Sequence, residues 1–280
     1  MTRRRRLLLS LVAALVTACS APAPGPSLTV AASSDPENIL LANIYAAGLR
    51  YYGTAARVDV VDDPLAALDA GNASVAAGFT GVLLARFDPA SQARSPESVY
   101  RAMIGALPEG VAAGDYAVAA EDKPALAVTE STADAWGGRD LAALVRNCGG
   151  VSVGARTGVA TPSEVGDCAL PPVREFGNDA GLFDALRAGA VTAAWTTTVD
   201  TDIPGDVIVL VDRKPTLIQS RNAVALYRRN ELDTMQLRAV NELAGVLDTT
   251  SLTDMLRAVK GGADPQSVAQ DWLNANPLGR

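Results

Sequence analysis

The stretch DALRAGAVTAAWTTT, from Asp184 to Thr198, has a near copy earlier in the chain, AALDAGNASVAAGFT, from Ala66 to Thr80. In each copy a short helical pattern ends at a glycine, Gly71 or Gly189. Glycine most readily takes the left-handed conformation that closes a helix. A run of small apolar residues follows the glycine and is typical of a buried strand. The repeat therefore predicts two similar αβ segments in different parts of the chain.

An aromatic residue and a hydroxyl follow each predicted strand: Phe79-Thr80 follows Val75–Ala77, and Trp195-Thr196 follows Val191–Ala194. In open α/β sheets, ligands bind at the carboxyl ends of the strands. We therefore expect two lobes that each present an aromatic side chain to one shared cleft. The alternative is that these are two unrelated αβ corners whose aromatic ring only fills the core.

The composition is that of a globular chain with an apolar leader. Its 280 residues, 49% hydrophobic and 20% charged, are enough for one or two domains with a substantial core. The chain has no histidine, which removes the usual general base and the commonest metal ligand. No glycine-rich phosphate loop and no cysteine metal cluster stands out either. We therefore expect no enzyme activity, no metal and no cofactor.

Residues 1–18 are typical of a bacterial lipoprotein signal peptide. Four arginines at positions 3–6 precede an apolar run, Leu7–Val16, that is too short for a stable membrane anchor. The following Thr17-Ala18-Cys19 completes a pattern that resembles the bacterial lipobox, in which the cysteine is lipidated and becomes the mature N-terminus. Acyl chains such as palmitate on Cys19 would hold the protein on a membrane surface without a spanning helix. An ordinary secretion signal is the alternative.

After Cys19, the proline-rich SAPAPGPS completes a predicted tether over residues 19–27. Removal of the leader takes away four arginines and no acid, which leaves 20 basic and 31 acidic residues and a net charge of −11. Such an acidic body argues against nucleic acid or an anionic membrane surface as the ligand. We expect the protein in the cell envelope, lipid-anchored to the outer face of the bacterial cell membrane.

Two further cysteines, Cys148 and Cys168, would reach an oxidising compartment after export, where a disulfide between them is the default. The bond would close a loop of about twenty residues and contribute on the order of 3 kcal/mol.

Strand patterns alternate with helix patterns along the rest of the chain, which favours an α/β fold with mostly parallel pairing. The helix predicted over residues 38–52 begins with Ser34 as its cap, Pro36 in the first turn and Glu37 completing a capping box. A second capping box is predicted at Thr161–Glu164. The C-terminal region is predicted as three helices over residues 235–247, 252–260 and 265–274.

Several segments, in order and over nearly the whole mature chain, resemble the osmoprotectant-binding proteins of ABC importers, which capture glycine betaine, choline or proline betaine. We identify the chain as a divergent lipoprotein member of that family. The segments that carry the resemblance are Ala32–Ile39, Gly78–Val82, Ala185–Gly189 with Ala194–Thr197, Asp212–Lys214 and Ala263–Ala269.

The resemblance implies a type II periplasmic-binding-protein fold, or Venus flytrap, with two α/β lobes. Lobe 1 would comprise residues 28–121 and 215–280, and lobe 2, residues 122–214, would be inserted in it. The terminal helices would return to lobe 1. The family holds its solute between the lobes in an aromatic cage, through cation–π attraction. Closure then docks the protein, a monomer, onto an ABC permease and its ATPase.

The chain departs from the family where the aromatic cage is expected. Pro36 replaces a phenylalanine, Phe79 replaces a tyrosine, and Leu217–Ser220 followed by Arg221 replaces Phe-Pro-Pro-Tyr. An arginine there would repel a bare cation but can hold a carboxylate with two hydrogen bonds; a surface salt bridge is the alternative. We therefore expect a solute with a carboxylate or similar acceptor and a hydrophobic or ammonium part, and not free choline.

The expected ligand-binding residues combine the aromatic side chains with polar groups at helix starts and strand ends. A helix N-terminus suits an anionic group, and the threonine hydroxyls can donate hydrogen bonds. Helix or strand-end capping is the alternative for the serines and threonines. The set is Ser33, Ser34, Phe79, Thr80, Arg156, Thr157, Trp195, Thr196, Thr197 and Arg221.

The sequence thus predicts an extracytoplasmic solute-binding lipoprotein of an ABC importer, which takes up an osmoprotectant-like or quaternary-ammonium/carboxylate solute. The alternative is an envelope lipoprotein of the same fold that has lost solute capture and binds a protein or lipid partner.

Overall fold

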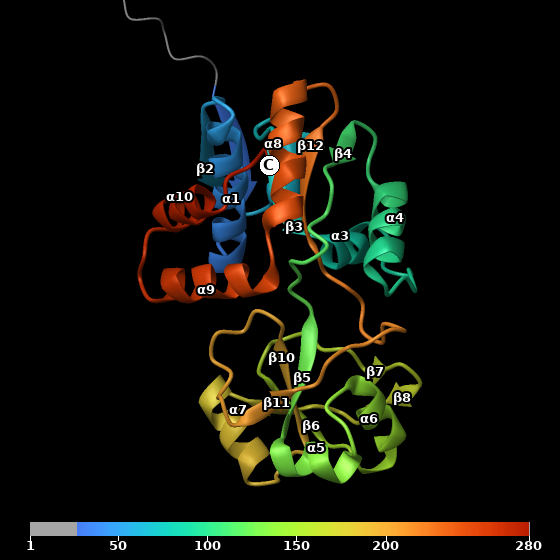
Figure 1. Cartoon of the computed structure of the whole chain (residues 1–280). Coiled ribbons are helices and arrows are strands. Elements are labelled where there is room, and N and C mark those ends of the chain that lie inside the picture. The colour runs from blue at the N-terminus through green and yellow to red at the C-terminus, as the bar shows by residue number, and fades with distance from the viewer. Residues whose placement is uncertain (1–26, 280) are drawn as a thin grey trace, which may run out of the picture.

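The computed structural model describes residues 27–279, which form two α/β lobes, each built on a five-stranded sheet (Figure 1). The predicted signal peptide, Cys19 and most of the tether lie outside the described residues, so the lipid anchor stays a prediction. Across residues 27–279, none of the helices has the length and apolar composition that crossing a membrane requires.

Lobe 1 contains the sheet β2-β1-β3-β12-β4. Strand β1 runs parallel to β2 and β3, whereas β12 is antiparallel to both β3 and β4. The strands are β1 (Leu28–Ala32), β2 (Ala56–Val60), β3 (Val75–Phe79), β4 (Val111–Ala113) and β12 (Ala223–Arg228).

Lobe 2 repeats this arrangement in the sheet β9-β6-β10-β5-β11. Strand β6 is parallel to β9 and β10, and β5 is antiparallel to β10 and β11, so each strand has a counterpart of the same direction in lobe 1. The strands are β5 (Pro124–Thr129), β6 (Val153–Arg156), β9 (Arg174–Phe176), β10 (Ala193–Thr197) and β11 (Val207–Val209).

The repeated sequence unit occupies the same place in the two lobes, because β3 and β10 are the central strands of their sheets. Helix α2 (Pro64–Asp69) leads into β3 and helix α7 (Asp179–Arg187) into β10. The glycines between helix and strand both have positive φ, 75° at Gly71 and 69° at Gly189, as the helix-closing role requires. Strand β10 begins two residues later than predicted and includes Trp195.

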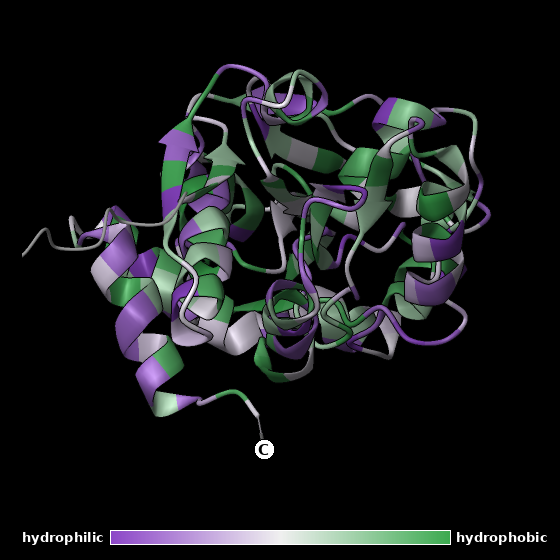
Figure 2. Cartoon of the chain, turned by 90° about the horizontal axis from the view of Figure 1, so that it is seen from above, coloured by the Kyte–Doolittle hydropathy of each residue, from purple (hydrophilic) through white to green (hydrophobic). Residues whose placement is uncertain are grey.

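Helix α1 (Pro36–Tyr51) is the centre of the lobe 1 core. All ten residues from Leu40 to Leu49 are buried, because the sheet covers one side of α1 and the C-terminal helices α8, α9 and α10 cover the other. The three C-terminal helices thus pack against α1 of lobe 1. Figure 2 shows hydrophilic residues on the outer turns of helices and hydrophobic residues toward the sheet. The C-terminal helices are α8 (Thr234–Val246), α9 (Thr249–Lys260) and α10 (Pro265–Ala275).

The N-cap of α1 is Asp35, and the predicted cap at Ser34 is wrong. The Asp35 carboxylate accepts hydrogen bonds from the amides of Glu37 (2.8 Å) and Asn38 (3.4 Å). Pro36, at the first helical position, has no backbone N–H that needs an acceptor. A cap at Asp35 can therefore accept hydrogen bonds from the next two amides of the first turn. The side chain of Glu37 is thus not used in a capping box and is directed elsewhere.

Shorter elements complete the two lobes. The capping box predicted at Thr161–Glu164 is wrong, because Glu164 begins a two-stranded hairpin instead. The shorter elements are α3 (Thr80–Phe87) and α4 (Pro96–Ala106) in lobe 1, and α5 (Glu130–Trp136), α6 (Leu141–Arg146), the 3-10 helix Cys148–Gly150, β7 (Glu164–Val165) and β8 (Cys168–Ala169) in lobe 2.

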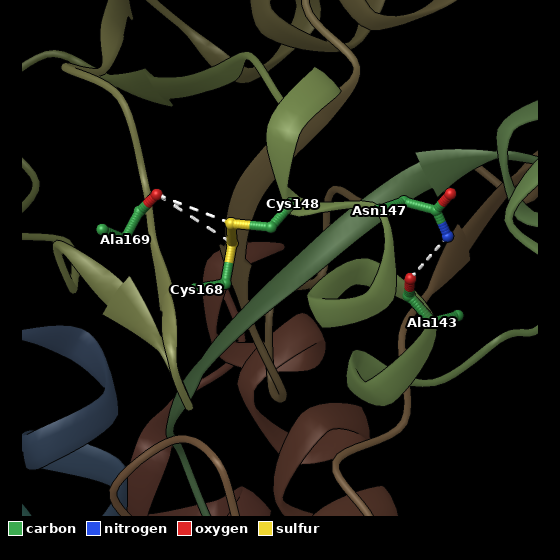
Figure 3. Close-up of a disulfide and its surroundings, with 5 residues drawn as sticks. All are labelled: Ala143, Asn147, Cys148, Cys168 and Ala169. Atoms are coloured by element: carbon green, nitrogen blue, oxygen red, sulfur yellow. Dashed lines mark hydrogen bonds between the residues drawn. A yellow bond between two sulfur atoms is a disulfide. The ribbon is translucent and has the colours of Figure 1, made fainter.

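A disulfide joins Cys148 to Cys168, with their Cα atoms 5.6 Å apart, and confirms the predicted pairing (Figure 3). It ties the end of the α6 region to the β7-β8 hairpin. Both sulfur atoms lie near the carbonyl oxygen of Ala169, at 3.7 and 4.0 Å.

Two chain crossings run side by side between the lobes. The backbone amide of Asp122, on the first crossing, donates a 2.9 Å hydrogen bond to the carbonyl of Arg221 on the second. Next to Asp122, the buried Lys123 forms a 3.2 Å ion pair with Asp212, which begins the return path. Ile218 still packs in the lobe 2 core, so the chain leaves lobe 2 beyond that residue. The crossings thereby hold Asp122 and Arg221 at the junction of the lobes.

Candidate functional site

A cleft of about 300 Å³ lies between the lobes. In Figure 1, helix α9 forms the edge of lobe 1 that faces lobe 2, and β10 lies at the near end of lobe 2. The lining residues are Asp35, Pro36, Glu37, Leu256 and Lys260 from lobe 1, Asp122 from the first crossing, and Arg156, Val159, Asp179, Trp195, Thr196, Thr197, Val199 and Asp200 from lobe 2.

The cleft is acidic, because five of its lining residues carry carboxyl groups and two are cations. Each cation already has an acidic neighbour. Arg156 pairs with Asp179 at 3.1 Å, and Lys260 lies 3.6 Å from a carboxylate oxygen of Asp202. Carboxylate charge is therefore in excess in the cleft, which favours a ligand with a positive portion.

Glu37 is the most perturbed acid of the cleft. Burial, followed by the charge and hydrogen bond of Asp122 and the charge of Asp35, raises the pKa of Glu37 to about 9, although Lys260 acts in the opposite direction. Glu37 is therefore protonated at neutral pH, and its carboxyl group can donate a hydrogen bond as well as accept one.

Asp122 shares this environment but has compensating partners. Burial raises the pKa of Asp122, whereas hydrogen bonds from Thr197 and Glu37 and the positive charge of Arg221 lower it. The net effect raises the pKa of Asp122, and the two neighbouring carboxyl groups titrate as a coupled pair, in which ionisation of one opposes ionisation of the other. Apart from the hydrogen bond that links the two carboxyl groups, the buried oxygens Glu37 Oε1 and Asp122 Oδ1 accept no hydrogen bond from another residue of the described part of the chain.

Trp195 is the one predicted aromatic residue that lines the cleft. Its position in the central strand β10, opposite Leu126 of β5, fixes its backbone, and its side chain is only 4% exposed. Within residues 27–279 its indole Nε1 is a buried donor without an acceptor. Its neighbour Thr196 donates a 2.6 Å hydrogen bond to Asp200, which holds the following turn against the cleft.

The structure brings four of the ten predicted site residues to the cleft: Arg156, Trp195, Thr196 and Thr197. The other six do not line it. Phe79 is 8% exposed and packs in the lobe 1 core. Thr80 is fully buried, and its hydroxyl accepts a 3.0 Å hydrogen bond from the amide of Asn222. Phe79 and Thr80 therefore contact the end of the second crossing, at Asn222 and Ala223, and not the cleft.

Three more predicted residues lie near the cleft without lining it. The amide of Ser33 donates a 2.7 Å hydrogen bond to the side chain of Asn38, and Ser34 is exposed. The hydroxyl of Thr157 donates to the carbonyl of Phe176 at 3.2 Å. Local hydrogen bonds thus account for the positions of Ser33 and Thr157.

Arg221 lies behind the cleft carboxyl groups. Burial lowers the pKa of Arg221, and the charges of Asp122 and Glu37 raise it. The close approach of Gly81 helps to place it, because a Cβ atom at Gly81 would lie 2.5 Å from the carbonyl oxygen of Ser220 and 2.8 Å from Arg221 Cγ. Arg221 is thus positioned as a counter-ion of the carboxyl groups.

Sequence reasoning missed the acidic part of the site. It interpreted Glu37 as part of a capping box and did not select Asp179, which begins α7 directly after the N-cap Asn178. Asp122 is the first residue of the predicted lobe 2. Because the crossings border the cleft in two-lobed folds, this position could have indicated Asp122 as a cleft residue. No local pattern indicated Lys260.

Two lobes of matching topology, one inserted in the other, with two crossings and an interlobe cleft, define a type II periplasmic-binding-protein fold. Solved structures agree. The chain is similar to a "glycine betaine/carnitine/choline ABC transporter" structure (16% identity, TM-score 0.72, 89% of this chain and 98% of that one). It is also similar to apo YehZ from Escherichia coli, with 18% identity and a TM-score of 0.68 over 90% of this chain and 99% of that one. A third similar structure is lactococcal OpuAC complexed with glycine betaine, with 10% identity and a TM-score of 0.52 over 89% of this chain and 96% of that one. At these identities the likeness shows the fold.

The family model described as the substrate binding domain of the ABC-type glycine betaine transport system matches residues 26–163 and 172–275. The chain belongs to this family, as the sequence resemblance predicted. It is therefore an extracytoplasmic substrate-binding protein of the ABC-importer type, a binding protein and not an enzyme, in a family that delivers small solutes to a permease. A comparison with curated proteins found no match.

Proposed function

We propose that this chain is the solute-capturing lipoprotein of an ABC importer. It binds a small, osmoprotectant-like solute with an ammonium portion and an acceptor portion, and passes it to a permease that works with an ATPase. The observation that carries this proposal is the cleft itself, in which Glu37 of lobe 1, Asp122 of the crossing and Trp195 of lobe 2 converge.

The acidic side of the cleft takes the positive end of the solute. The carboxylate of Asp122 supplies the negative charge, and the Trp195 ring adds a cation–π contribution of about 0.5–2 kcal/mol. The acceptor end of the solute takes hydrogen bonds from the indole Nε1 of Trp195 and from the cations Arg156 and Lys260, with Thr196 and Thr197 at the rim. Contacts with both lobes stabilise the closed arrangement.

The remaining predicted site residues act on the solute through the residues they position. Arg221 favours the ionised form of Asp122, and Thr80 and Phe79 hold the second crossing against lobe 1. Ser33, Ser34 and Thr157 shape the loops that border the cleft.

A ligand screen with a matched pair of variants tests this function. Thermal unfolding would be followed with betaines, carnitine, amino acids and small sugars, and hits would be titrated by calorimetry. Trp195→Phe keeps an aromatic face, on a smaller ring, but removes the N–H, and should weaken binding by about fivefold to twentyfold, following the ~1.4 kcal/mol per decade rule. The control is Trp272→Phe, because Trp272 also has an unpartnered Nε1 but lies on α10, outside the cleft. If no solute raises the unfolding temperature, the proposal is wrong.

The lipid anchor is tested separately. Cys19→Ala should release the protein from the cell envelope or leave its leader uncleaved. A cleaved Cys19→Ala protein that stays in the envelope as fully as the wild type would exclude lipidation at this cysteine.

A further inference from the structure

Half of the buried side-chain atoms without a hydrogen-bond partner in the described part of the chain belong to residues that line the cleft or, in the case of Arg221, lie directly behind it. They are two carboxyl oxygens, Glu37 Oε1 and Asp122 Oδ1, and two nitrogen donors, Trp195 Nε1 and Arg221 Nε. The other four lie on Arg50, Ser220, Asn222 and Trp272. Buried polar groups in native proteins are almost always paired, so a cluster of unpaired ones indicates the place and chemistry of a ligand.

The unpaired carboxyl oxygens distinguish between two kinds of positive group. A quaternary ammonium presents only methyl or methylene groups, so it can neutralise charge but donates no N–H hydrogen bond. A primary or secondary ammonium, or a guanidinium, offers N–H donors that form charge-assisted hydrogen bonds with such oxygens. A single tryptophan among the lining residues is also a poor replacement for the aromatic cage that a quaternary ammonium requires.

Building on the proposed function, we propose that the cleft selects solutes whose positive end carries N–H donors over quaternary ammonium solutes, and that Glu37 releases its proton to solvent when such a solute binds. The O–H bond of the Glu37 carboxyl group breaks, the proton passes to the buffer, and the resulting carboxylate accepts an N–H hydrogen bond from the solute.

The charges that face Glu37 explain why proton release requires a bound cation, whereas the N–H donors of the solute stabilise the carboxylate that the release produces. Asp35, at the start of its own helix, and Asp122, on the first crossing, favour the protonated form. Lys260 on α9 opposes them, and Arg221, on the second crossing, is coupled to Glu37 by charge. A cation bound in the cleft adds a positive charge beside the Glu37 and Asp122 carboxyl groups and therefore favours the ionised form of Glu37. Binding is therefore linked to proton loss, and affinity should rise with pH between about 6 and 8.5.

The test uses glycine, sarcosine, N,N-dimethylglycine and glycine betaine, which share one carboxylate while successive methyl groups replace the N–H donors. Ethanolamine and choline form a second pair without the carboxylate. Calorimetry at pH 7.5 in two buffers of different ionisation enthalpy gives affinity and proton release together. We expect affinity to fall by about tenfold or more when the last N–H is lost, and about one proton to be released per N–H solute bound.

Two variants separate this inference from general effects of charge. Glu37→Gln keeps the shape of the protonated side chain and should abolish proton release and reduce the preference for N–H solutes. Glu97→Gln removes an exposed acid on α4, far from the cleft in the fold, and should change neither.

The possible outcomes are distinct. If glycine betaine or choline binds as tightly as its N–H counterpart, without proton release, the inference is overturned while the proposed function stands. If neither series binds and the wider screen finds no ligand, both are overturned.

Discussion

Asp122 and Arg221 meet where the two chain crossings run side by side: the amide of Asp122 donates a 2.9 Å hydrogen bond to the carbonyl of Arg221. The Arg221 guanidinium group is largely buried, and its charge stabilises the ionised Asp122 carboxylate. The Asp122 carboxyl group therefore lies at the junction of the lobes, where the proposed cationic solute would contact a crossing that connects them.

Arg221→Met should weaken the binding of a cationic solute by about tenfold or more at pH 6, following the ~1.4 kcal/mol per decade rule. Without the guanidinium charge the pKa of Asp122 rises further, so less of the carboxylate is ionised. Binding should recover as the pH is raised to 8.5, which calorimetric titration at the two pH values measures. The control is Arg139→Met, because Arg139 forms an exposed ion pair with Glu130. Unchanged affinity at both pH values would contradict this role.

Glu37→Gln should make the protein more stable than the wild type at pH 8, with little difference at pH 4. Burial raises the pKa of Glu37 to about 9 in the folded protein, against about 4.3 in the unfolded chain. Between these values the folded state holds a proton that the unfolded state does not, so wild-type stability falls as the pH rises. Glutamine is neutral throughout and removes this loss. Urea unfolding at pH 4, 6 and 8 measures the effect, and parallel pH profiles for the two proteins would show that Glu37 is ionised in the fold.

Gly81→Ala should lower the free energy of unfolding by about 1–3 kcal/mol, the usual cost of overpacking. Its Cβ atom would lie 2.5 Å from the carbonyl oxygen of Ser220, a backbone atom that cannot turn away. The matched control is Gly105→Ala, in an exposed position of α4 with no atom within 4 Å of the added Cβ. That change should be neutral or slightly stabilising, since alanine is the better helix former. Equal stability of the two variants by urea unfolding would exclude a tight contact at Gly81.

Reduction of the Cys148–Cys168 disulfide should lower the free energy of unfolding by about 3 kcal/mol, because the bond restricts a loop of 20 residues in the unfolded chain. Urea unfolding of a chain that starts at Ser27, which lacks Cys19, measures this with and without a reductant. The Cys148→Ala/Cys168→Ala variant should match the reduced protein and not respond to the reductant. A reduced protein as stable as the oxidised one would contradict the expectation.

Local patterns predicted the architecture well. The helix-closing role of Gly71 and Gly189 depends only on the backbone conformation of a few neighbouring residues. Both glycines have the positive φ that this role requires. Trp195, Thr196 and Thr197 were found as cleft residues for the same reason, since they belong to a central strand that ends at the cleft. Phe79, chosen by the same pattern, packs in the lobe 1 core and does not line the cleft, whereas Trp195 packs in the lobe 2 core and also lines the cleft.

The acidic part of the site could not be predicted from such patterns. Glu37, Asp122 and Lys260 come from a helix start, a crossing and a C-terminal helix, and only the folding of α9 and the crossing onto the start of α1 brings them together. The sequence motif at Glu37 was equally compatible with a helix cap, and Asp35 took that role because it directly precedes Pro36.

The amino-acid sequence by itself determined the family, the two repeated αβ units and the residues that close their helices, because these depend on short-range backbone preferences and on the order of apolar segments. Only the tertiary structure decided which side chains share the cleft and which of them carry charge. The ionisation of Glu37 and Asp122 depends on burial and on charges from distant parts of the chain, and a carboxyl group has no fixed charge until the fold surrounds it.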